Sequence, residues 1–146
     1  MFVVDTNVLA YAANRGAAEH GRCKAFVDRC VAQQTRWYLT WGILYEFLRV
    51  VTHTRAISHP QPLVQAWEFV ETLLASPGLA FLEQTPRHAT IAAQTWKESP
   101  SLRGNRMLDA HTAVLMREHG IRRIYTHDKD FQKFAFLEVV DPLKQA

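Results

Sequence analysis

The N-terminal stretch Phe2-Val3-Val4-Asp5-Thr6-Asn7 carries the strongest indication of the fold. Its short apolar run, bounded by polar residues, is typical of a buried parallel strand that ends at Asp5. Thr6 or Asn7 then caps a helix that includes Val8. A strand that leads directly into a helix favours an α/β architecture.

The same alternation of strand and helix continues along the chain. Further strands are expected at residues 37–40, 79–82, 123–126 and 136–140, and helices at 19–34, 42–52, 63–75, 86–97 and 105–119. Gly120 is expected to end the last helix as a left-handed cap. The pattern predicts a three-layer α/β sandwich: a central parallel sheet of about five strands with helices on both faces. Because the polar loop at 99–104 is too short to divide domains, we expect one domain over residues 1–146.

Composition places the chain among ordinary globular proteins, with 48% hydrophobic and 21% charged residues in a length of 146. No stretch reads as a targeting or membrane-spanning segment, so we expect a cytoplasmic protein without a membrane association. Cys23 and Cys30 do not have the spacing of a zinc or redox motif and are expected to be buried thiols. Core packing is the expected role of the tryptophans, at positions 37, 41, 67 and 96.

Four acidic residues stand out because of their positions. Asp5 and Asp128 directly follow apolar strands, whereas Glu46 and Asp109 lie within helical segments next to apolar residues. An ionised carboxylate is costly to bury, and several together repel one another, so a divalent cation is the natural partner. Ligands of open parallel sheets bind beyond the carboxyl ends of the strands. The acids therefore predict a Mg²⁺ or Mn²⁺ site and a metal-dependent phosphodiesterase.

Each acid also has a purely structural interpretation. A strand-to-helix aspartate is often just a helix cap, and an acid three residues from an arginine on a helix often forms an ion pair. The alternatives are a cap for Asp5, a pair with Arg49 for Glu46, a pair with Arg106 for Asp109, and a turn for Asp128 and Asp130. The ordered set of acids on one α/β frame favours the metal site.

Four motifs together resemble the PIN-domain ribonucleases, and more narrowly a VapC-type toxin of a bacterial toxin–antitoxin pair. The motifs are Phe2 to Asn7, Tyr45-Glu46-Phe47-Leu48-Arg49, Leu108-Asp109-Ala110-His111 and Tyr125-Thr126-His127-Asp128-Lys129-Asp130-Phe131. The resemblance covers essentially the whole chain. It implies a PIN-like fold, endonucleolytic cleavage of RNA, a homodimer, and a cognate antitoxin that masks the acidic pocket.

The resemblance also implies a role for individual residues. Asp5 and Asp109 match the principal metal ligands, Glu46 matches the glutamate carried on a helix, and Asp128 matches the acid of the last motif. Asp130 is a supporting or alternative ligand, and the choice between it and Asp128 stays open. Orientation of the ligands through hydrogen bonds is implied for the polar residues Thr6, Asn7 and Thr126.

Phosphate contacts are expected from the arginine-rich segment at residues 22–55, with Arg36 and Arg49 as candidates. The alternative for these arginines is a solvated helix face. Two other functions stay open at this point. One is a catalytically silent PIN-type module that binds RNA or acts as a scaffold, and the other is a structure-selective DNase with the same metal chemistry.

Overall fold

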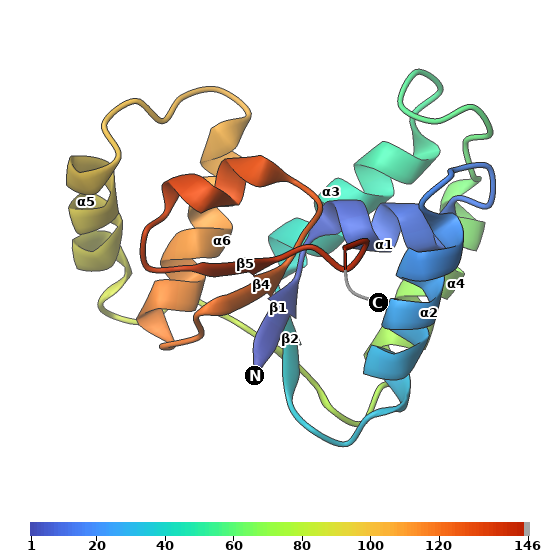
Figure 1. Cartoon of the computed structure of the whole chain (residues 1–146), viewed down its shortest axis with the longest axis horizontal. Helices are drawn as coiled ribbons and strands as arrows, with labels where there is room; N and C mark the ends of the chain where they lie inside the picture. The colour runs from blue at the N-terminus through green and yellow to red at the C-terminus, as the bar shows by residue number, and fades with distance from the viewer. Residues whose placement is uncertain (145–146) are drawn as a thin grey trace.

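The computed structural model describes residues 1–144 and contains one parallel sheet flanked by helices (Figure 1). The strands are β1 (Phe2–Val4), β2 (Trp37–Leu39), β3 (Leu79–Phe81), β4 (Arg123–Tyr125) and β5 (Glu138–Val140). The α-helices are α1 (Thr6–Ala13), α2 (His20–Ala32), α3 (Trp41–Thr52), α4 (Leu63–Leu74), α5 (His88–Glu98) and α6 (Arg106–Glu118). A 3₁₀-helix, η1 (Lys129–Lys133), lies between β4 and β5. The predicted three-layer α/β fold is confirmed.

The strand order is β3-β2-β1-β4-β5, with every neighbouring pair parallel. After β1 the chain builds outward through β2 and β3, and then returns to add β4 and β5 on the other side. The order therefore reverses between β1 and β4, which are paired in register from Phe2 and Arg123 to Val4 and Tyr125. Ligand sites of open α/β sheets lie at such a reversal, beyond the carboxyl ends of the strands.

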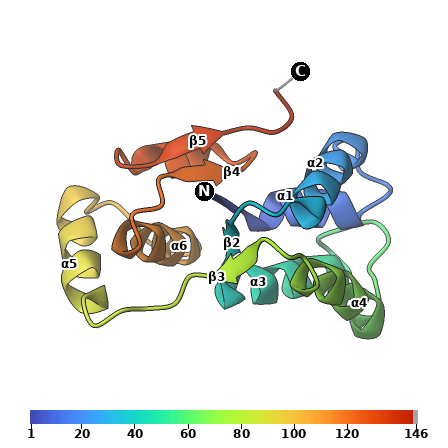
Figure 2. The ribbon, with the colours of Figure 1, turned by 90° about the horizontal axis from the view of Figure 1, so that it is seen from below.

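Figure 2 shows the sheet between two helical layers, with α5 and α6 on one side and α1 to α4 on the other. Three side chains of the central strands are completely buried: Val3, Val4 and Ile124 are 0% exposed. These positions are apolar because helices cover both faces of the sheet there. The core thus fixes β1 and β4 rigidly, and with them the residues that follow each strand.

Most element boundaries agree with the sequence-based expectation, and the differences are local. Helix α1 begins at Thr6 because the Asp5 side chain accepts the Thr6 N–H, so Asp5 and not Thr6 or Asn7 is the cap. The 3₁₀-helix was not predicted, although the Asp128 side chain caps it in the manner of a turn aspartate. Gly120 adopts the expected left-handed conformation, with a φ of 67°.

The expectation for the tryptophans is wrong for most of them. Trp37 is fully buried, but Trp41, Trp67 and Trp96 are each at least 36% exposed. These three lie on helices, and an amphipathic pattern does not distinguish the core from the edge of an apolar stripe. Cys23 and Cys30 are buried free thiols, as predicted. Among residues 1–144, no helix combines the length and apolar character needed to cross a membrane.

Candidate metal centre

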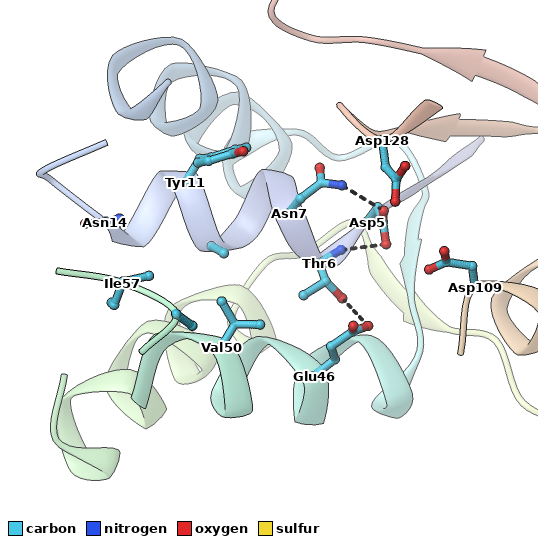
Figure 3. A pocket seen from close by; sticks show the side chains of 12 residues that line it. Asp5, Thr6, Asn7, Tyr11, Asn14, Glu46, Val50, Ile57, Asp109 and Asp128 are labelled. Atoms are coloured by element: carbon cyan, nitrogen blue, oxygen red, sulfur yellow. Dashed lines mark hydrogen bonds between the residues drawn. The ribbon is translucent and has the colours of Figure 1, made fainter. Parts of the chain in front are cut away.

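Four carboxylates from four separate elements line one pocket at the carboxyl edge of the sheet (Figure 3). Asp5 follows β1, Glu46 lies on α3, Asp109 on α6, and Asp128 follows β4. The residues are far apart in sequence and meet because β1 and β4 end side by side while α3 and α6 approach the same edge. The structure thus brings together the four acids that the sequence singled out.

Asp5 is the most firmly held of the four and is only 5% exposed. Its Oδ1 accepts from the Thr6 backbone N–H at 2.8 Å, and its Oδ2 accepts from Thr126 Oγ1 at 2.8 Å and Asn7 Nδ2 at 3.1 Å. Burial raises the pKa of Asp5 to about 6, with the negative charges of Glu46 and Asp128 adding to the effect of burial and the hydrogen bonds from Thr126 and Thr6 opposing it. The Asp5 carboxylate therefore both caps α1 and lines the pocket.

Glu46 reaches the pocket from α3 and contacts α1. Its Oε2 accepts from Thr6 Oγ1 at 3.2 Å. The ion pair with Arg49 is present, but its N···O separation is 3.7 Å and the Arg49 side chain is 61% exposed. A solvated pair of this kind contributes little. The pair therefore accounts for only part of the Glu46 environment, because the other carboxylate oxygen is held by Thr6.

Asp109 has neither a hydrogen-bond donor nor a cationic partner within the described chain. The pKa of Asp109 is raised to about 7, mainly by burial. Repulsion from the other acids raises it further, and Asp5 and Asp128 contribute most to that repulsion. Arg106, one helical turn earlier, pairs with Asp130 at 3.6 Å and not with Asp109. The structural alternative for Asp109 is therefore not realised.

Asp128 and Asp130 lie on the same turn. Asp128 Oδ1 accepts the Asp130 backbone N–H at 2.8 Å. Among the described residues, Asp109, Asp128 and Asp130 can place one carboxylate oxygen each within 4.8 Å of one another. Asp128 lines the pocket with Asp5 and Glu46, whereas Asp130 is drawn toward Arg106. This arrangement favours Asp128 as the ligand, and the assignment stays a prediction.

The residues present fit a hard divalent cation. All the donors are carboxylate oxygens, which Mg²⁺ and Mn²⁺ prefer. The charges are under-compensated, because Asp109 receives no counter-charge from the described residues, and repulsion from the neighbouring acids adds to burial in raising its pKa. A bound cation would remove that repulsion and allow all four acids to ionise.

The predicted arginine candidates are separated by the structure. Arg36 precedes β2 and donates to the Leu79 carbonyl at the start of β3, so it lies at the edge of the sheet opposite the acids. Arg49 lies on α3, one turn from Glu46. Arg106 beside Asp130 was not proposed as a phosphate ligand from the sequence. A cluster of arginines in the sequence does not show whether each arginine will lie at the amino or the carboxyl edge of the sheet.

Comparisons with known proteins identify the family of the chain. The family model for the PIN domain matches residues 2–137. Ribonuclease VapC48 of Mycobacterium tuberculosis is 33% identical over 142 residues, covering 94% of each chain, and Ribonuclease VapC33 of the same organism is 33% identical over 150 residues, covering 99% of this chain and all of the relative.

Solved structures share the fold at lower identity. The M. tuberculosis toxin VapC20, described as cleaving the sarcin–ricin loop, has a TM-score of 0.65 and 21% identity over 95% of this chain and 98% of its own. The VapBC2 complex of Rickettsia felis, bound to a promoter DNA fragment, has a TM-score of 0.68 and 13% identity over 96% of this chain and 97% of the matched one. The chain belongs to the PIN-domain family, among relatives named as VapC ribonucleases.

Proposed function

We propose that this protein is a Mg²⁺-dependent endoribonuclease and the toxin of a toxin–antitoxin pair. The observation that carries the proposal is the convergence of Asp5, Glu46, Asp109 and Asp128 on one pocket at the reversal of strand order. The named relatives support ribonuclease activity, since two VapC ribonucleases are one-third identical over nearly the whole chain.

The residues of the site have separable tasks. Asp5, Glu46, Asp109 and Asp128 would hold Mg²⁺ or Mn²⁺, with Asp130 in support. When bound, the cation supplies a water of lowered pKa and neutralises charge on the phosphoryl oxygens. Thr126 and Asn7 fix the rotamer of Asp5 through hydrogen bonds to the same oxygen. Thr6 links the two sides of the pocket, because its backbone N–H holds Asp5 and its hydroxyl holds Glu46.

Partners follow from the relatives and from the exposed surface. An antitoxin protein is proposed because structural neighbours include VapBC2 and FitAB assemblies. A homodimer is proposed from the family resemblance, and the neighbouring exposed rings of Trp41 and Tyr45 on α3 offer an apolar surface for it. A cytoplasmic location remains part of the proposal.

Cleavage of total bacterial RNA by the purified protein tests the proposed activity. We expect discrete cuts in Mg²⁺ and none in EDTA, and sequencing of the new ends identifies the target. Single-stranded and structured DNA of matched length serve as controls. Cleavage of DNA with intact RNA would favour the DNase alternative. Binding of RNA without cleavage in either Mg²⁺ or Mn²⁺ would favour the silent module.

A further inference from the structure

The pocket that holds the acids does not end at the acids. It continues along α1, between α1, α3 and the loop at residues 53–61, with a total volume of about 320 Å³. Its far part is lined mainly by Ala10, Tyr11, Asn14, Val50 and Ile57. That volume includes the acidic end and lies near the lower limit of small-molecule sites, roughly 300–1,000 Å³. An apolar chamber is therefore continuous with the candidate metal centre.

The spacing along α1 relates the two ends of the pocket. Asn7, Tyr11 and Asn14 are separated by four and then three residues, which places them on one face of the helix. Two turns of helix from Asn7 to Asn14 span roughly 10 Å. This length is comparable to the reach from a phosphate across its ribose to the outer edge of the attached base. Figure 3 shows Asn14 and Ile57 at the end of the pocket opposite Asp5 and Asp109.

The far end also has an oriented polar group. Asn14 lines the pocket, and its Oδ1 accepts the Gly16 backbone N–H at 3.2 Å. Within residues 1–144, Asn14 Nδ2 donates no hydrogen bond to the protein. An amide donor at the rim of an apolar chamber suits a flat ligand with apolar faces and an acceptor on its edge, which describes a nucleobase.

The wall opposite α1 is held in place. Gln61 Nε2 donates to the Ala13 carbonyl at 2.8 Å, and the Gln61 backbone N–H donates to the Val51 carbonyl at 2.8 Å. These bonds tie the end of the 53–61 loop to α1 and α3 at once. Ile57 therefore approaches α1 as part of a loop that is anchored to both helices.

We propose that this chamber is a subsite for the base of one nucleotide next to the scissile phosphate, with Asn14 Nδ2 donating to a carbonyl or ring nitrogen of that base. The inference rests on the proposed ribonuclease function and adds to it the residues that select the cleavage position. Contacts to base edges and faces carry sequence information, whereas contacts to phosphate do not. Asn14 and Ile57 are thus assigned as specificity residues.

A double-mutant cycle tests the subsite, in which a substitution in the protein is combined with removal of one base from the RNA. The substrates are a short RNA carrying a mapped cleavage site and two copies of it with an abasic ribose, one on each side of the cut. Ile57→Trp fills the chamber, and Asn14→Ala removes the donor. We expect Ile57→Trp to lower kcat/KM on the intact RNA by about tenfold or more. On the abasic RNA that lacks the bound base, the same substitution should cost much less, because the two changes remove one interaction.

A control variant and a second substitution in the chamber complete the test. Val64→Trp, at a 74% exposed position on α4, should behave as wild type. Asn14→Ala should alter the base preference at one position next to the cut, and it gives the answer alone if Ile57→Trp fails to fold. Equal losses on intact and abasic RNA would overturn the proposal, as would unchanged RNA cleavage together with lost antitoxin binding. If wild type cuts none of the RNAs in Mg²⁺, the proposed function fails first and the subsite fails with it.

Discussion

Thr126 donates its hydroxyl to Asp5 Oδ2 at 2.8 Å, joining the ends of β4 and β1 across 121 positions of sequence. The same hydroxyl oxygen accepts from Asn7 Nδ2 at 2.9 Å and from the Asp128 backbone N–H at 3.0 Å. One buried threonine therefore positions the residues on both sides of the strand-order reversal. Because its donated bond lowers the pKa of Asp5, Thr126 also opposes the effect of burial on that carboxyl.

Replacing Thr126 with valine removes these three hydrogen bonds at nearly constant volume. We expect a loss of about 1–3 kcal/mol in the free energy of unfolding, measured in urea, because buried groups lose their partners. The pKa of Asp5 should rise further, so the acidic limb of the pH profile of kcat/KM should move to higher pH. Thr126→Ser retains the hydroxyl and should preserve the profile. A valine variant with wild-type stability and profile would show that the threonine positions nothing.

The pH dependence of stability without metal reports on Asp109. Burial raises its folded-state pKa to about 7 from an ordinary value of 3.8. Its stabilising contribution is therefore complete below about pH 4 and is lost as the pH rises through 7. In EDTA, Asp109→Asn should raise the free energy of unfolding at pH 7.5 by about 1–3 kcal/mol and flatten its decline between pH 4 and 7.

Asp28→Asn is the control for this experiment, since Asp28 is an exposed acid paired with Lys24. It removes the same charge far from the cluster and should leave the pH dependence of stability unchanged. An Asp109→Asn variant that is less stable than wild type in EDTA would indicate that Asp109 is held by a structural partner.

The sequence predicts the scaffold well because its signals are local. Apolar runs before Asp5 and Asp128 identify strands, and a parallel sheet necessarily brings their carboxyl ends to one edge. The positions of Arg36 and the exposed Trp41 could not be predicted in the same way. The strand order decides at which end of a strand a charged residue lies. Packing between distant elements decides how much of a helix is buried. Asn14 gave no signal, because an asparagine just after a helix is expected as ordinary turn chemistry.

Arginines near the site should contribute to RNA affinity, and those at the opposite edge should not. Arg106→Ala or Arg49→Ala should weaken RNA binding similarly across sequences and reduce the slope of log affinity against log salt by about one unit per lost contact. Binding is measured with RNA anisotropy on the Asp109→Asn protein to prevent cleavage. Arg36→Ala is the matched control and should keep the wild-type slope. A reduced slope for Arg36→Ala alone would place the RNA path on the other edge of the sheet.

Glu118 on α6 anchors the segment that leads into α5. Its side chain is fully buried and accepts from the Thr85 N–H at 2.9 Å and the Thr85 hydroxyl at 2.7 Å, and it contacts His88 Nδ1 at 2.7 Å. Although burial acts to raise the pKa of Glu118, the bonds from Thr85 and His88 hold it below the ordinary 4.5. The stabilisation is therefore present above about pH 4.5 and is lost as the pH falls.

Glu118→Ala should lower the free energy of unfolding by about 2–4 kcal/mol at pH 7, because it leaves the Thr85 N–H and His88 without their acceptor. Urea titrations at pH 7 and pH 4 check both the loss and its decrease in acid. A neutral effect at pH 7 would show that solvent replaces the carboxylate without cost. The test is independent of the metal centre, because Glu118 lies outside the pocket lined by the four acids.

The most direct test of the account is the Mg²⁺ dependence of cleavage at one mapped RNA site, measured for wild type, Asp5→Asn, Asp109→Asn and Asp28→Asn. Each substitution removes one carboxylate charge at nearly constant side-chain size. The account predicts that wild type and Asp28→Asn cut with the same Mg²⁺ dependence, while Asp5→Asn and Asp109→Asn remain folded and do not cut at any Mg²⁺ concentration. Wild-type cleavage by either site variant, or cleavage by wild type in EDTA, would contradict it.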